Sequence, residues 1–142
     1  MMKKFTWLIL FVWILAACNE YTNVTEVVEP YTYTRQISVN REDWRRIQDE
    51  NNPGIYHYCQ VKETNLTDYI FDNGVMQAFL YDRGTMSPLP FSDFVNDENK
   101  YYGEEHFTVE FQPGYVTFIL KTDYNTGLPY YNYYDFMIRF LW

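Results

Sequence analysis

The sequence is poor in the residues on which most catalytic and metal sites depend. Its 142 residues include only two cysteines and two histidines, and the six glycines are scattered without forming a phosphate-binding loop. A zinc site needs three or four ligands, and neither His57 nor His106 has a second His or Cys at a ligand spacing. Ser38, Ser87 and Ser92 all lie outside a Gly-x-Ser-x-Gly turn. The sequence therefore predicts a protein that is not an enzyme and that holds no metal or cofactor.

Basic residues are also scarce. The chain has 11 Lys and Arg against 19 Asp and Glu, which gives a formal net charge of -8 at pH 7. This charge repels phosphate, so we expect no nucleic-acid partner and no contact with anionic lipid beyond an anchor. Aromatic residues, in contrast, make up 21% of the chain and include 15 tyrosines. Disordered chains are poor in aromatics, so a single folded domain is expected.

No apolar run is long enough to span a bilayer. The longest, residues 5–17, is interrupted only by Thr6, whereas a spanning helix needs about 20 residues. Two lysines precede this run and small residues close it, which is the order of a secretory signal peptide. The run leads into Leu15-Ala16-Ala17-Cys18, which resembles the lipobox of bacterial lipoproteins. Residues 1–17 are therefore predicted to be a lipoprotein signal peptide.

The lipobox resemblance implies a membrane anchor. In that family the signal is cut just before the cysteine, so Cys18 would carry diacylglycerol and an N-acyl chain such as palmitate. The alternative is an ordinary secretory signal followed by a chance cysteine. Residues 18–30 are then the lipidated cysteine and an acidic linker. Position 19 is Asn, not the Asp that marks inner-membrane retention in enterobacterial lipoproteins, so the resemblance implies an outer-membrane site in the cell envelope, with its face unspecified.

Residues 31–142 show the alternation of apolar and polar side chains that is typical of half-buried β-strands. The alternating segments are 31–40, 54–62, 107–112, 116–121 and 136–142, and segment 75–81 is more uniformly apolar, as in a central strand. Segment 44–48 either pairs with 54–61 or belongs to a short helix. Pro113-Gly114 predicts a hairpin turn, and Thr67 and Gly74 are expected to cap one helical turn. His57 and Cys59 lie in a strand-like run, where packing is expected.

Six or seven short strands with almost no helix predict an all-β domain. We expect an antiparallel β-sandwich of the Ig-like or Greek-key type, or a small barrel. The domain also resembles small β-sandwich lipoproteins of the Bacteroidota, whose biochemical role is largely unassigned. That likeness implies fold and location but no catalytic residue. It rests on the order of Trp44, Asn65-Leu66-Thr67, Asn73-Gly74-Val75, Tyr81, Leu89-Pro90 and the terminal strand 135–141.

Clustered tyrosines are the remaining functional pattern. They lie in expected loops or strand ends, where binding residues concentrate, and offer a flat apolar face with a hydroxyl. The candidate ligand-binding residues are Tyr101, Tyr102, Tyr130, Tyr131, Tyr133 and Tyr134. The alternative is packing, because tyrosine is a favoured strand residue.

Three functions remain open at this point. The sequence favours a lipid-anchored, non-catalytic binding module for a glycan or another envelope protein. One alternative is a structural or accessory subunit of an envelope assembly, with the terminal strand through Phe140-Leu141-Trp142 as a free sheet edge for a neighbour. The other is an inhibitor of a foreign hydrolase, because small acidic lipoproteins can neutralise basic lysozymes.

Overall fold

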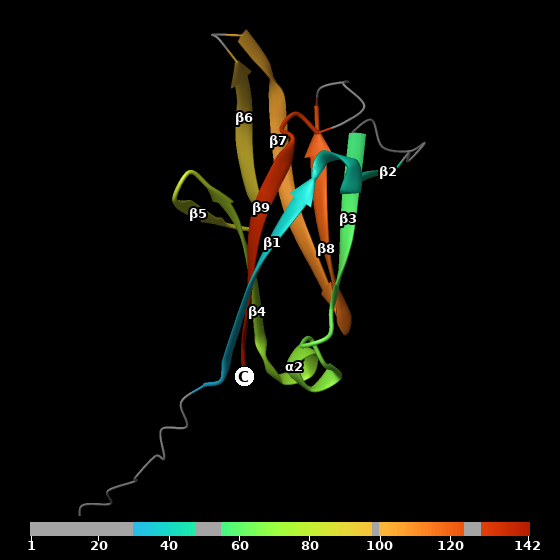
Figure 1. Cartoon of the computed structure of the whole chain (residues 1–142), viewed down its shortest axis with the longest axis vertical. Coiled ribbons are helices and arrows are strands. Elements are labelled where there is room, and N and C mark those ends of the chain that lie inside the picture. The colour runs from blue at the N-terminus through green and yellow to red at the C-terminus, as the bar shows by residue number, and fades with distance from the viewer. Residues whose placement is uncertain (1–29, 48–54, 98–99, 124–128) are drawn as a thin grey trace, which may run out of the picture.

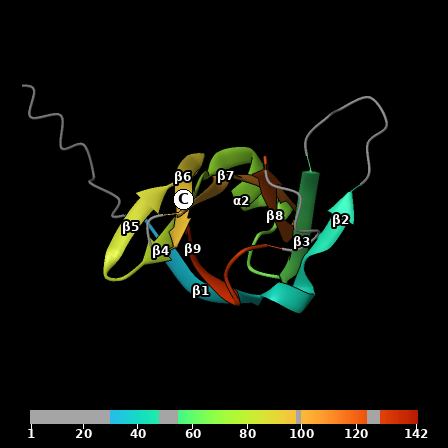
Figure 2. The same ribbon diagram turned by 90° about the horizontal axis from the view of Figure 1, so that it is seen from above.

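The computed structural model describes residues 30–47, 55–97, 100–123 and 129–142. They form two antiparallel sheets that pack face to face (Figures 1 and 2). The first sheet has the order β1-β9-β4-β5, and its strands are β1 (Thr32–Asn40), β9 (Tyr133–Leu141), β4 (Val75–Asp82) and β5 (Thr85–Pro88). The second has the order β2-β3-β8-β7-β6, and its strands are β2 (Arg45–Ile47), β3 (Ile55–Glu63), β8 (Gly114–Thr122), β7 (Lys100–Gln112) and β6 (Phe91–Asp97).

The predicted antiparallel sandwich is confirmed, and the sheets do not close into a barrel. Strands β6, β7 and β8 follow one another in the chain and are neighbours in the sheet. Strand β3 lies beside β8, although β4 and β5 of the other sheet come between β3 and β6 in the chain. This order is a Greek-key arrangement. The described residues form nine strands instead of six or seven, because the sequence pattern misses β5 and β6. Polar residues interrupt the alternation in β6, and β5 is only four residues long.

The terminal strand is not a free edge, so that expectation is wrong. Strand β9 pairs with β1 on one side and with β4 on the other. In segment 44–48 the pairing alternative is confirmed for residues 45–47, which form β2 and pair with β3. A 3-10 turn (Arg41–Asp43) precedes this strand, and Gln48 lies outside the described residues. Within the described residues, no helix is long and apolar enough to cross a membrane.

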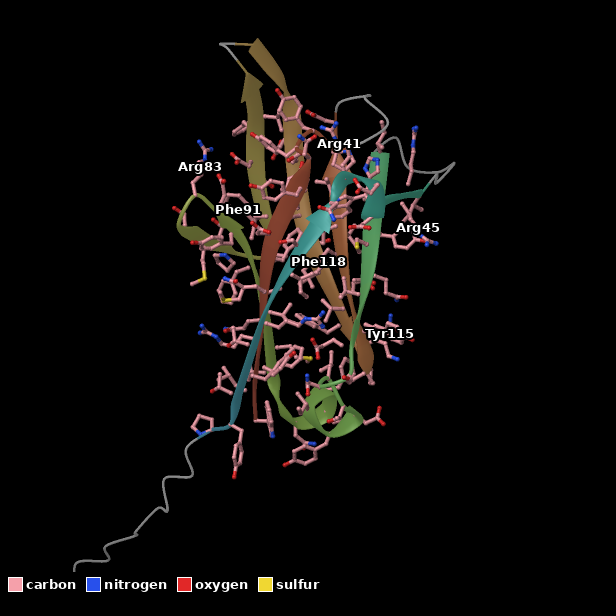
Figure 3. All side chains as sticks on the ribbon, viewed as in Figure 1. Arg41, Arg45, Arg83, Phe91, Tyr115 and Phe118 are labelled. Carbon is pink, nitrogen blue, oxygen red and sulfur yellow. The ribbon has the colours of Figure 1, made fainter. Side chains whose placement is uncertain are left out.

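The core lies between the inner faces of the two sheets. Phe118 of β8 stacks on Phe136 of β9 with ring centroids 4.1 Å apart, and Figure 3 shows Phe118 in the middle of the sandwich. His57 and Cys59 are buried in this layer, as the packing prediction requires. Burial raises the pKa of the Cys59 thiol, so the side chain stays a neutral apolar group.

The predicted helix caps and the predicted hairpin turn are also confirmed. The hydroxyl of Thr67 accepts a hydrogen bond from the Ile70 amide and caps α2 (Asp68–Asn73). Gly114 has a φ of 82° in the tight β7–β8 turn, a conformation that favours glycine. Gly74 follows α2 with an extended backbone, and its need for glycine is steric. A Cβ atom there would lie 2.6 Å from the Ile70 carbonyl oxygen and 2.9 Å from that of Leu141.

The paired strands β1 and β9 give the domain two distinct ends. Their register runs from Thr32 opposite Leu141 to Asn40 opposite Tyr133, a length of roughly 30 Å. The chain enters the domain and leaves it at the same end, which also carries α2; we call this the entry end (Figure 1). Tyr133 and Asn40 lie at the opposite end.

Candidate functional site

Three of the six candidate tyrosines come together in one cleft. Tyr131, Tyr133 and Tyr134 line a cleft of about 650 Å³ at the end of the domain opposite the entry end. The other walls come from the β4–β5 turn, from β6 and from the inner face of β7. We call this hollow the tyrosine cleft, and its remaining lining residues are Leu80, Tyr81, Asp82, Arg83, Asp93, Glu105, Phe107, Asn132 and Asp135.

Arg41 fixes the chain segment that carries the tyrosines. Its backbone amide donates to the Asn132 carbonyl at 2.8 Å. Its guanidinium donates to the carbonyl of Tyr130 and, at 3.4 Å, to that of Tyr131. These three bonds tie the approach to β9 to the end of β1, so the cleft wall is held by the sheet.

The tyrosines divide into accessible and structural side chains. Tyr131 is 42% exposed and Tyr133 is 61% exposed, whereas Tyr134 is buried, as expected for neighbours on opposite faces of a strand. The Tyr134 ring packs 5.2 Å from that of Phe107, between ring centroids, and its hydroxyl donates to Glu105 Oε1 at 2.6 Å. The Tyr131 ring stands edge-on to Tyr134, with centroids 5.8 Å apart. Both expected roles, surface and packing, therefore occur in this cluster.

Acidic groups outnumber basic groups in the tyrosine cleft. Its lining includes four carboxylates, from Asp82, Asp93, Glu105 and Asp135, and one guanidinium, from Arg83. Asp135 accepts a hydrogen bond from the Ser38 hydroxyl, and Asp82 pairs with Arg83 at 3.2 Å. Both members of that ion pair are largely exposed, so the pair is weak and leaves Asp82 open to other partners.

The acidic surroundings act on Tyr131. Its partial burial raises the pKa of its hydroxyl above the ordinary 10.0, and the carboxylates of Glu105, Asp93 and Asp82 add to the shift, which Arg83 opposes. The Tyr131 hydroxyl therefore stays protonated through the neutral range and can donate as well as accept a hydrogen bond.

The other candidate residues lie outside this cleft or outside the described structure. Tyr130 is half-buried and its ring stands edge-on to that of Tyr131 at 5.0 Å. Tyr101 and Tyr102 belong to the start of β7, and their side chains lie outside the described residues. Cys18 also lies outside them.

The sequence reasoning missed the carboxylates of the tyrosine cleft. Asp82 and Arg83 reach the cleft because the chain reverses at Arg83-Gly84, where both residues have positive φ angles of 46° and 83°. Glu105 was detectable, because it shares the inner face of β7 with Phe107 and Val109, and an acid on an apolar face is unusual.

His106 and Ser92 form a second polar pair. Ser92 Oγ lies 2.5 Å from His106 Nδ1, and the two residues are cross-strand partners in β6 and β7. Glu105 points inward toward the cleft, so its neighbour His106 points away from it. No group of three or more potential metal ligands occurs within the described part of the chain. We therefore treat this pair as a hydrogen bond that stabilises the sheet.

Comparisons with known proteins supply no functional assignment. No protein-family model, curated protein or solved structure matches this chain.

Proposed function

We propose that this protein is a lipid-anchored cell-envelope protein whose tyrosine cleft binds a glycan without catalysis. The observation that carries the proposal is the presence of two exposed tyrosine rings, Tyr131 and Tyr133, in one cleft with four carboxylates. Sugar rings present C–H faces that stack on aromatic rings, while their hydroxyl groups donate to carboxylates. The cleft combines both kinds of contact on a segment that Arg41 holds in place.

The charge of the cleft narrows the class of glycan. Four carboxylates against one guanidinium leave three formal negative charges in the lining. A glycan that carries carboxylate, sulfate or phosphate would be repelled, whereas a neutral sugar is tolerated and an amino sugar is attracted. We therefore propose a neutral or amino-bearing glycan as the ligand.

The position of the cleft supports an anchor at Cys18. The linker that follows Cys18 joins the domain at the entry end, and the cleft lies at the opposite end of β1 and β9. An acylated Cys18 would hold the entry end near the membrane and leave the cleft facing away from it. Replacing Cys18 with serine should abolish palmitate labelling, and unchanged labelling would end the anchor proposal.

Alanine substitutions test the proposed glycan site. We expect Tyr131→Ala and Tyr133→Ala each to weaken glycan binding at least tenfold in calorimetric titrations, because each removes a stacking face without emptying the core. The glycan is first selected on an array that holds neutral, amino-bearing and acidic sugars. Tyr115→Ala is the matched control, since Tyr115 has the same 42% exposure as Tyr131. It lies near the start of β8, whereas the end of that strand pairs with Glu105 of the cleft.

Two results would contradict the glycan proposal. One is unchanged affinity in both tyrosine variants, and the other is unfolding of both variants while Tyr115→Ala stays folded. The second result would assign these rings to packing.

A basic protein partner is the second candidate, and the surplus of carboxylates in the cleft favours it. In that case the chain would inhibit a basic foreign hydrolase or join an envelope assembly through a lysine or arginine side chain of the partner. Inhibition of a basic lysozyme that disappears in Asp93→Asn, combined with no binding on the glycan array, would favour this candidate.

A further inference from the structure

Exposed aromatic side chains gather at the entry end. Tyr31 is 67% exposed, Tyr69 65%, Phe71 38% and Trp142 36%. The backbones of Tyr31 and Trp142 pair through hydrogen bonds of 2.8 and 3.1 Å, and their rings stack with centroids 6.1 Å apart. We call these four residues the aromatic end.

The helix that carries Tyr69 and Phe71 packs directly against the same end of the sheet. Gly74, which follows α2, lies so close to the Leu141 carbonyl that a Cβ atom there would stand 2.9 Å from the oxygen. The next residue, Val75, pairs with Leu141 and is itself 55% exposed. Figure 1 shows α2 beside the C-terminus, at the bottom of the domain. The aromatic end therefore consists of the stacked pair Tyr31 and Trp142 and of α2, which Gly74 and Val75 join to Leu141 of the sheet.

The chemistry of this end differs from that of the tyrosine cleft. Tyrosine and tryptophan combine an apolar ring with a polar group, and for that reason they concentrate at the headgroup level of membrane proteins. The charged side chains of α2 beside the aromatic rings are acidic, from Asp68 and Asp72. Such a surface suits a zwitterionic lipid interface better than an anionic one.

We propose that the aromatic end rests on the membrane–water interface and so orients the domain. This inference rests on the proposed anchor at Cys18, because the twelve residues 19–30 between Cys18 and Tyr31 reach about 40 Å when fully extended. A tether of that length keeps the aromatic end at high effective concentration near the bilayer, so a weak contact is sufficient. The contact places the tyrosine cleft roughly 30 Å farther out, along β1 and β9.

Tryptophan fluorescence in vesicles tests the contact. The lipidated chain from Cys18 onward, which the proposed anchor requires, contains Trp44, which is buried, and Trp142 as its emitters. The purified protein is reconstituted into phosphatidylcholine vesicles, either plain or with brominated acyl chains, and flotation measures its membrane attachment. We expect bromine to reduce the Trp142 emission at least twofold, and adding Trp142→Phe to remove that quenching.

Further variants separate a shared surface from a single exposed tryptophan. Tyr69→Ser with Phe71→Ser should halve the quenching of Trp142, because the aromatic end then loses half of its rings. Ile47→Ser with Met86→Ser is the matched control, since both residues are exposed and lie in strands β2 and β5, away from this end; it should leave the quenching unchanged. Replacing half of the lipid with phosphatidylglycerol should also weaken the quenching.

Flotation distinguishes a failed contact from a failed anchor. Protein that floats with the vesicles but shows equal emission in plain and brominated lipid overturns the contact and leaves the anchor intact. Protein that does not float overturns the anchor and the contact together. Neither result bears on glycan binding by the tyrosine cleft, which is measured separately in solution.

Discussion

Each end of the sandwich holds a buried glutamate, but the two carboxylates have different surroundings. Glu63, at the entry end, accepts hydrogen bonds from the Tyr33 hydroxyl at 3.2 Å, from Arg35 at 3.0 Å and from the backbone and side chain of Asn65 at 3.0 Å each. Glu105, at the other end, accepts from the Tyr134 hydroxyl at 2.6 Å and from the Tyr130 amide at 3.4 Å, and it lines the tyrosine cleft. Glu63 is enclosed by donors of its own chain and stabilises the fold, whereas Glu105 combines donors of its own chain with a place in the cleft lining, where it adds negative charge to the site.

The pKa directions sharpen this contrast. Burial by itself raises the pKa of Glu63, but the hydrogen bonds from Arg35, Asn65 and Tyr33 outweigh it and hold the pKa below the ordinary 4.5. At the other end, burial and nearby carboxylates raise the pKa of Tyr131. The entry end is thus adapted to hold a negative charge, whereas the cleft end adds unfavourable negative potential around a neutral hydroxyl.

The largest effect is expected from a substitution in the core that both ends share. Phe136 is 1% exposed and stacks on Phe118, so Phe136→Ala leaves a cavity between the sheets. We expect the free energy of unfolding to fall by about 4 kcal/mol, and glycan binding to be lost with the fold. Urea denaturation measures the change. A loss below about 1 kcal/mol would mean that the two ends are stabilised independently of this core.

Exchanging each glutamate for glutamine compares the two ends directly. Glu63→Gln should lower the free energy of unfolding by about 2 kcal/mol, because an amide cannot accept all four hydrogen bonds and loses the charge opposite Arg35. Its glycan affinity should match that of the unaltered chain. Glu105→Gln should reduce glycan affinity at least fivefold. Equal effects of both variants on binding would remove the distinction between the ends.

The same variant predicts a pH dependence of stability. The pKa of Glu63 is lower in the folded chain than in the unfolded chain, so its stabilising contribution is complete above the unfolded pKa and is lost as the pH falls through the folded pKa. The free energy of unfolding should therefore decrease on acidification below about pH 5. Glu63→Gln should show a smaller decrease over the same range, and an identical decrease in both proteins would contradict this role for Glu63.

The sandwich could be predicted from the sequence because apolar and polar residues alternate in any strand with one buried face. The sequence pattern missed β6, where Ser92 and Asp93 follow Phe91 and break that alternation at a sheet edge. It also placed the terminal strand at a free edge, because the sequence cannot say how many neighbours an apolar strand has.

The candidate site was predictable only on one wall. The run of tyrosines from 130 to 134 marks one side of the cleft in the sequence itself. The opposing carboxylates of Asp82, Asp93 and Glu105 come from three other strands or turns, and only the packing of the two sheets brings them to the tyrosines. The division of that run into accessible and buried rings likewise depends on the direction in which β9 enters the sheet.

The smallest effect is expected from the removal of one hydroxyl group of the cleft. Tyr131→Phe keeps the stacking ring and removes the hydroxyl, whose pKa is raised by burial and by the nearby carboxylates. We expect glycan affinity to fall about threefold, less than in Tyr131→Ala, because one hydrogen bond is lost while the aromatic face remains. Calorimetric titration between pH 6 and pH 9 should give the same ratio throughout, since the raised pKa keeps the hydroxyl protonated over that range. A ratio that changes with pH would show that a different titrating group contacts the ligand, and a loss equal to that of Tyr131→Ala would assign the binding energy to the hydroxyl and not to the ring.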